Sequence, residues 1–90
     1  MTMTMIKLFS DIAWEDYTSW IDEDRKIMKK INTLLKDVER NPFDGLGKPE
    51  PLRNELSGYW SRRITEKHRL IYKVYEDKIY IIGCKGHYDD

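Results

Sequence analysis

The stretch "YWSRRITEKHRLIYKVYEDKIYIIGC", residues 59–84, decides the fold. Three segments within it are rich in β-branched and aromatic residues, which favour strands: "YWSRRIT", "RLIYKVYE" and "KIYIIGC". The breaks between them, "EKH" and "EDK", are too short for the crossover that parallel strands need. The second half of the chain is therefore predicted to form an antiparallel meander.

The first half of the chain has helical periodicity instead. Apolar residues recur at helical spacing in a segment that ends at Asn41-Pro42: Ile27, Ile31, Leu34, Leu35 and Val38. An earlier helix is predicted from the capping residues Ser10 and Asp11 to about Asp22. Its expected apolar face consists of Ala13, Tyr17, Trp20 and Ile21. Before it, residues 5–9 ("MIKLF") form a short strand candidate.

A connector, "NPFDGLGKPEP" (residues 41–51), separates the two halves. Its two glycines and three prolines exclude a helix or a central strand. We expect one domain, residues 1–90, with an α+β fold. Two N-terminal helices are predicted to pack on one face of a small, mostly antiparallel twisted sheet.

The predicted hairpins indicate which side chains share a face of the sheet. A turn centred on Asp77 pairs Leu70 with Cys84, Tyr72 with Ile82 and Val74 with Tyr80. These even-numbered positions are expected to face the helices, and odd-numbered ones the opposite side, here called the open face. A turn near Lys67 puts Arg63 across from Ile71. The open face is then expected to gather four polar side chains: Arg63, Arg69, Lys85 and His87.

Charge and cysteine content narrow the partners and the compartment. Lys plus Arg equals Asp plus Glu at 16 each, so the net charge is zero. Binding of free nucleic acid by electrostatics alone needs a basic protein, so any RNA contact requires a local patch or help from a larger partner. The single cysteine, Cys84, excludes an internal disulfide and fits a cytoplasmic protein. Neither a membrane span nor a secretory signal is expected.

Few residues stand out as candidates for chemistry. Glu50 lies between two prolines, which stiffen its backbone, although a surface turn glutamate would have the same pattern. Arg62 and Arg63 are adjacent on a strand, so one is expected to cover a helix and the other to face outward. His68 falls in a turn, where histidines are usually idle. Two histidines and one cysteine argue against a zinc site.

A carboxylate, arginines and a terminal histidine-tyrosine pair can together cleave RNA without a metal. A base must activate the ribose 2′-hydroxyl, cations must stabilise the phosphate, and an acid must protonate the leaving oxygen. Histidine can act as acid or base because its ordinary pKa is ~6.5. The composition is compatible with this chemistry but does not by itself indicate it.

The motifs "NPFDGLGKPEPL", "LSGYWSRRITEKHRLIYKV" and the terminal "GHY" resemble the YoeB (Txe) toxins of bacterial toxin–antitoxin systems, within the RelE-like superfamily. The resemblance runs from the first predicted strand to Tyr88. It implies a RelE-like fold and a ribosome-dependent endoribonuclease. The lack of a metal-ligand cluster in the sequence separately predicts that no metal or other cofactor is needed. The implied substrate is mRNA in the A site of the 70S ribosome. The implied partner is a YefM-like antitoxin, and a homodimer is also compatible.

The resemblance assigns roles to individual residues. Glu50, in the Pro-Glu-Pro segment, corresponds to the general base, and Arg69 to the phosphate-stabilising arginine. His87 corresponds to the general acid, with Tyr88 beside it. Arg63 is a supporting phosphate contact in this interpretation.

Further predictions concern residues expected next to this site. Arg53 and Lys85 are additional RNA- or phosphate-binding candidates. Asp89 and Asp90 follow the His-Tyr pair, where relatives commonly stop, and are expected to tune the pKa of His87 rather than to disable it.

The antitoxin is expected to cover the open face. Ile71, Ile79 and Ile81 fall on it in the predicted register, and an uncovered apolar patch is typical of a partner site. A disordered antitoxin tail would order over this patch, and its acidic residues would pair with Arg63 and Arg69.

Two other function classes stay open. A ParE-like relative shares the fold and blocks DNA gyrase, but it does not need the Glu50, Arg69 and His87 set, whose presence argues against this class. A non-catalytic module would only bind the antitoxin as a co-repressor.

Overall fold

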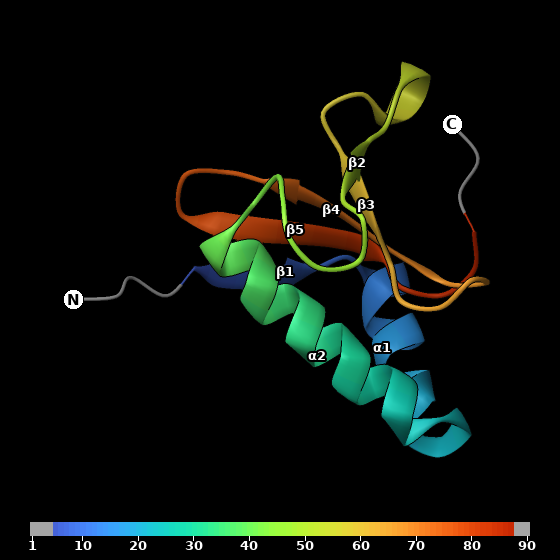
Figure 1. The fold of residues 1–90 in the computed structure, drawn as a ribbon. Coiled ribbons are helices and arrows are strands. Elements are labelled where there is room, and N and C mark those ends of the chain that lie inside the picture. Colours follow the sequence, from blue (N-terminus) through green and yellow to red (C-terminus); the bar gives the residue numbers. More distant parts are fainter. Residues whose placement is uncertain (1–4, 88–90) are drawn as a thin grey trace.

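Two helices cover one face of a five-stranded sheet in the computed structural model, which describes residues 5–87 (Figure 1). The elements in chain order are β1 (Ile6–Phe9), α1 (Asp11–Glu23), α2 (Arg25–Arg40), β2 (Glu50–Pro51), the short 3-10 helix η1 (Asn54–Leu56), β3 (Trp60–Arg63), β4 (Arg69–Val74) and β5 (Lys78–Gly83). The strand order is β1-β5-β4-β3-β2. The predicted α+β class is confirmed.

Local capping fixes both helices where the sequence predicts them. The Ser10 hydroxyl accepts a hydrogen bond from the Ala13 N–H at the start of α1. Asp24 has extended backbone and ends α1, and its carboxylate accepts from the N–H groups of Lys26 and Ile27 at the start of α2. One residue therefore terminates one helix and begins the next, so α2 folds back along α1 (Figure 1).

The core lies between the helices and the sheet. Its buried members from the helices are Ala13, Trp20, Ile31, Leu34, Leu35 and Val38. Those from the sheet side are Ile64, Leu70, Tyr72, Ile79, Ile81 and Cys84. Ile21, predicted on the apolar face of α1, is 38% exposed. No helix within residues 5–87 is long and apolar enough to cross a membrane.

The predicted meander is confirmed, since β3, β4 and β5 pair antiparallel in sequence order. β1 joins the edge of the sheet parallel to β5, with Ile6 opposite Lys78. The β3–β4 turn is tighter than predicted, because the N–H groups of Ile64 and Thr65 both donate to the His68 carbonyl. Arg63 therefore lies across from Arg69, and the predicted pairing of Arg63 with Ile71 is wrong.

A β-bulge between Ile71 and Tyr72 changes the register of β4 with β5. Tyr72 pairs with Ile81 and Val74 with Ile79, one residue away from the predicted partners. The expected faces are correct on β4, where Leu70, Tyr72 and Val74 face the helices. They are wrong on β5, because the turn is closed by the bond from the Tyr75 N–H to the Lys78 carbonyl and is not centred on Asp77, which shifts the pairing next to the turn by one residue and reverses which side chains point inward. Beyond the bulge, Ile71 pairs with Gly83, as the predicted register requires.

Ile79 and Ile81 consequently belong to the core and not to the open face. Tyr80 and Ile82 alternate with them and are half-buried on the open face. The predicted patch is therefore wrong for Ile79 and Ile81, and Ile71 keeps its predicted side of β4 but is fully buried.

Candidate active site

The sheet register brings Glu50, Arg63 and Arg69 to the open face. Glu50 on β2 pairs with Ser61 on β3, and Arg63 lies two residues further along β3, so its side chain points to the same side. Arg63 in turn pairs with Arg69 on β4. From ordinary strand spacing, the Cα of Glu50 is about 8 Å from that of Arg63 and about 12 Å from that of Arg69.

Glu50 is held by backbone contacts on both sides. The Arg63 N–H donates to the Gly47 carbonyl at 2.6 Å before β2, and the Leu52 N–H donates to the Tyr59 carbonyl at 2.9 Å after it. Proline at positions 49 and 51 restricts the backbone further. The exposed carboxylate of Glu50 therefore extends from a fixed backbone.

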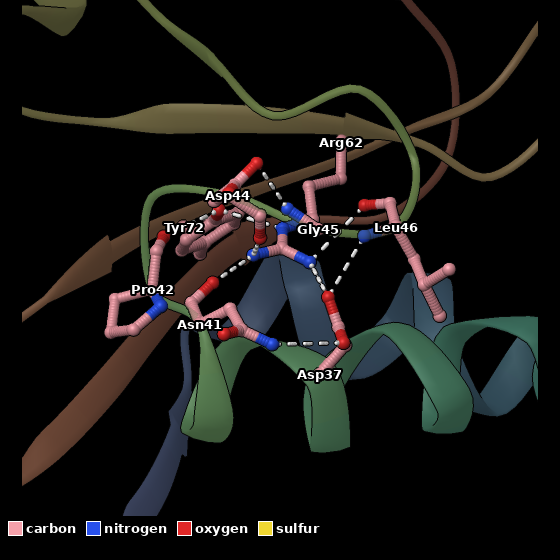
Figure 2. A network of polar contacts seen from close by, with 8 residues as sticks. All are labelled: Asp37, Asn41, Pro42, Asp44, Gly45, Leu46, Arg62 and Tyr72. Atoms are coloured by element: carbon pink, nitrogen blue, oxygen red, sulfur yellow. Dashed lines mark hydrogen bonds and ion pairs between the residues drawn. The ribbon is translucent and has the colours of Figure 1, made fainter.

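The connector before Glu50 is anchored by Arg62, which is fully buried on the helix side of β3 (Figure 2). Its Nε donates to the Tyr72 hydroxyl at 2.9 Å, and its Nη1 donates to the Asp37 carboxylate at 2.5 Å and the Leu46 carbonyl at 3.1 Å. Its Nη2 donates to the carbonyls of Asn41 and Asp44. The prediction that Arg62 and Arg63 face opposite ways is confirmed.

Asp37 and Tyr72 extend this network, and Figure 2 shows their side chains converging on the guanidinium. The Asp37 carboxylate also accepts from the Leu46 N–H at 2.9 Å. That bond, followed by the bond from Arg62, lowers the pKa of Asp37 below its ordinary value. The Tyr72 hydroxyl donates to the Pro42 carbonyl at 3.1 Å, and burial raises the pKa of Tyr72. The network ties the connector at several points before it reaches Glu50.

Arg69 is fixed at the start of β4 by its own turn. Its Nη1 donates to the carbonyls of Thr65 at 2.7 Å, Glu66 at 3.0 Å and His68 at 3.2 Å. Its backbone N–H donates to the Gly86 carbonyl at 2.9 Å. Arg69 therefore links the β3–β4 turn to the segment that carries His87.

His68 is not idle, so that interpretation of the turn histidine is wrong. Its ring packs edge-on against Trp20 with centroids 4.8 Å apart, and its Nδ1 accepts from the Gly86 N–H at 2.8 Å. The signal was present in the sequence, because the predicted pairing of β4 with β5, extended outward, sets His68 opposite Gly86. The position of His68 in a turn had suggested only an exposed side chain.

His87 follows a glycine that the β3–β4 turn holds from both sides. Gly86 donates to His68 and accepts from Arg69, and its φ of +89° lies in the left-handed region that favours glycine. His87 itself is exposed, next to this tie. The end of β5 and the β3–β4 turn lie side by side in Figure 1. Tyr88 and Asp89-Asp90 lie outside the described residues.

Lys85 does not join the arginines, so its predicted place on the open face is wrong. Its ammonium contacts Glu23 at 2.7 Å and Ser19 at 3.0 Å, and lies 4.7 Å from the Trp20 ring centroid, all on α1. The strand alternation is lost after Gly83, because the Cys84 N–H turns to donate to the Asp16 carboxylate. Lys85 then follows toward the helix.

Arg53 lies at the start of η1, in the exposed connection that rises from the sheet between β2 and β3 (Figure 1). The structure does not bring it into the paired arrangement of Arg63 and Arg69.

In the part of the chain that the structure describes, no three His, Cys, Asp or Glu side chains are grouped to hold a metal ion. The predicted independence from metal and cofactor stays a prediction.

Residues 9–88 match the family model described as "YoeB-like toxin of bacterial type II toxin-antitoxin system". The chain belongs to this YoeB family. Its YoeB relatives include Toxin YoeB of Escherichia coli (strain K12), which is 54% identical over 81 residues, covering 90% of this chain and 96% of that protein. The resemblance drawn from "NPFDGLGKPEPL", "LSGYWSRRITEKHRLIYKV" and the terminal "GHY" is confirmed.

Two solved YoeB structures from Staphylococcus aureus share the fold. A YoeB dimer superposes with a TM-score of 0.89 at 48% identity, covering 93% of this chain and 98% of that one. The toxin of a YoeB–YefM complex superposes with a TM-score of 0.87 at 46% identity, covering 94% and 99%. The YoeB fold thus accounts for both helices and the whole sheet.

Proposed function

We propose that this YoeB-family chain is a ribosome-dependent endoribonuclease that cleaves mRNA by acid–base catalysis without a metal. The observation that carries this proposal is the alignment of Glu50, Arg63 and Arg69 on one sheet face, with His87 next to a glycine bonded to Arg69. These are the charge types that cleavage through the ribose 2′-hydroxyl requires.

Each side chain has one task in the proposed reaction. The Glu50 carboxylate takes the proton of the 2′-hydroxyl, and the 2′-oxygen attacks the adjacent phosphorus. Arg69 and Arg63 stabilise the negative charge that develops on the phosphate oxygens. His87 gives a proton to the departing 5′-oxygen, which leaves a 2′,3′-cyclic phosphate on one fragment and a 5′-hydroxyl on the other. Tyr88 positions the phosphate or stacks on a base.

The ribosome has a physical role in this proposal. The net charge of zero gives the toxin little general attraction to RNA. Two arginines on the open face contribute only a small local attraction. The 70S ribosome would therefore present the mRNA in its A site, and the toxin would supply the reacting groups.

We further propose a YefM-like antitoxin as partner, since a Staphylococcus aureus relative forms a YoeB–YefM complex. The open face remains its proposed site, with a corrected apolar part. Ile6 and Leu8 on β1 are 61% and 47% exposed there, beside half-buried Tyr80 and Ile82 on β5. A homodimer is a further proposal, supported by the Staphylococcus aureus YoeB dimer.

Single-turnover cleavage of mRNA on 70S ribosomes tests the proposed reaction. Glu50→Gln and His87→Ala should each slow cleavage at least ~100-fold, the usual scale for a lost acid or base. Glu55→Gln is the matched control, because Glu55 is an exposed glutamate in the same connection, on η1. Cleavage by Glu50→Gln at the rate of the unmodified protein would refute the assignment.

A DNA supercoiling assay on the same preparations separates the ParE-like alternative. Inhibition of gyrase that persists in Glu50→Gln and His87→Ala would favour that alternative over RNA cleavage.

A further inference from the structure

Two consecutive residues clamp the glycine that precedes His87. His68 Nδ1 accepts from the Gly86 N–H at 2.8 Å, and the Arg69 N–H donates to the Gly86 carbonyl at 2.9 Å. Both polar groups of the Gly86 backbone are therefore bound to the β3–β4 turn. One half of this clamp is backbone and survives substitution, but the other half depends on the identity of residue 68.

The His68 ring is itself held in place. Its backbone N–H donates to the Thr65 hydroxyl at 3.0 Å, and its ring packs edge-on against Trp20. The Trp20 Nε1–H donates to the Cys84 carbonyl at 3.1 Å, two residues before Gly86. The ring therefore meets the terminal segment at a fixed position and acts as a directed acceptor.

Accepting a hydrogen bond at Nδ1 requires the neutral imidazole with its proton on Nε2. Burial, followed by the nearby charges of Lys67 and Lys85, lowers the pKa of His68, and Glu23 on α1 opposes this shift. Neutral His68 is thus the form expected at neutral pH. Protonation of Nδ1 would set two N–H donors against each other and break the bond to Gly86.

We propose that His68 is a positioning residue, which holds His87 beside Arg69 through the bond from the Gly86 N–H to the neutral His68 imidazole. The role in catalysis rests on the proposed endoribonuclease function. His68 touches neither phosphate nor ribose in this proposal. It restricts where the general acid can lie, and acid pH, which protonates the imidazole, opens the clamp from the His68 side.

Two substitutions at one position separate the acceptor from the bulk of the side chain. His68→Asn keeps an acceptor, because its Oδ1 can occupy the place of Nδ1, and it does not titrate. His68→Leu keeps apolar volume against Trp20 and loses the acceptor. His68→Gln, whose oxygen reaches the position of Nε2 instead, replaces the leucine variant if that variant does not unfold cooperatively.

Ribosomal cleavage gives the first measurement. His68→Leu should lower the single-turnover rate about tenfold, the factor that one ordinary hydrogen bond contributes to an equilibrium constant, with the half-saturating toxin concentration changed less than about twofold. His68→Asn should stay within about threefold of the unmodified protein. Equal rates for the leucine variant and the unmodified protein would overturn the proposal.

NMR of the free protein gives the second measurement, which does not depend on cleavage. Long-range ¹⁵N–¹H spectra should show His68 with its proton on Nε2. The Gly86 amide should be protected from exchange in the unmodified protein and in His68→Asn, and unprotected in His68→Leu. Its protection factor should fall as the pH is lowered far enough to protonate His68, and only in the unmodified protein.

The two measurements fail in different ways. A proton found on Nδ1, or Gly86 protection that is the same in all variants, would refute the clamp. If the unmodified protein does not cleave mRNA on ribosomes while the NMR results hold, the endoribonuclease proposal and the catalytic role of the clamp fail together, and the clamp itself stands.

Discussion

Replacing Arg62 by methionine would remove the centre of the network that anchors the connector. Methionine nearly matches the length of the stem but provides no donor, so five acceptors lose their partner: the Asp37 carboxylate, the Tyr72 hydroxyl and the carbonyls of Asn41, Asp44 and Leu46. Asn41, Asp44 and Leu46 are exposed, so water can reach that side of the network. Tyr72 is fully buried, and the side chain of Asp37 is only 16% exposed.

The expected cost is about 3–5 kcal/mol of unfolding free energy, the range for breaking a buried ion pair by removing one partner. For a domain of this length that corresponds to a fall in Tm of at least about 12 °C. Arg63→Met is the matched control: the same substitution on the exposed neighbour should change the unfolding free energy by less than about 0.5 kcal/mol.

Urea denaturation followed by tryptophan fluorescence, with thermal melts, measures both variants. The double variant Arg62→Met/Asp37→Leu should lose less than the sum of the two single changes, because the groups share one interaction. Equal stability of Arg62→Met and Arg63→Met would refute the reasoning, since the network would then contribute nothing beyond the bulk of its side chains.

Three further predictions concern titration. The lowered pKa of Asp37 means that its stabilising contribution is complete above about pH 4 and is lost as the pH falls through the lowered value, so Asp37→Asn should flatten acid unfolding curves in that range, and unchanged curves would contradict this. Burial raises the pKa of Cys84 to about 12, so iodoacetamide should label it only on unfolding; rapid labelling of native protein would oppose this assignment. Deleting Asp89 and Asp90 should move the basic limb of the cleavage pH profile to lower pH, because two carboxylates next to the proposed site are removed, and superimposable profiles would exclude such a role.

Local signals in the sequence carry the parts of the fold that were predicted well. Ser10 and Asn41 mark helix ends because a cap is a short-range interaction, and the breaks after Thr65 and Tyr75 leave room only for hairpins. The bulge at Ile71 and Tyr72 has no such signal, since neither residue is a glycine or a typical turn former. The faces of β5 were reversed because the turn closes between Tyr75 and Lys78, and Lys85 was misplaced because the strand alternation ends at Gly83.

Among the polar residues, too, some features were predicted from the sequence and others were not. Glu50 and Arg69 were predicted as site residues because their motifs are specific to a family, and Arg62 was predicted to face the helices from strand alternation. The number of hydrogen bonds that Arg62 makes could not be predicted, because three of its acceptors are carbonyls whose positions depend on the folded connector. The contact of His68 with Gly86 was not predicted, although the predicted register of β4 with β5, extended past both strands, already sets these two residues opposite each other.

The parallel pairing of β1 with β5 has a consequence for synthesis. β1 is translated first, yet its hydrogen-bonding partner begins at Lys78, so this edge strand has no ladder until nearly all the intervening chain exists. Ile79 and Ile81, which complete the core, lie on β5 itself. The hydrogen bond from the Gly86 N–H to His68 can form only after β5 has been made. Contacts between such distant segments form late and slowly. A nascent chain that stops short of β5 would therefore lack a closed sheet and would not yet contain His87, so under the proposed function it could not cleave mRNA on the ribosome that is making it.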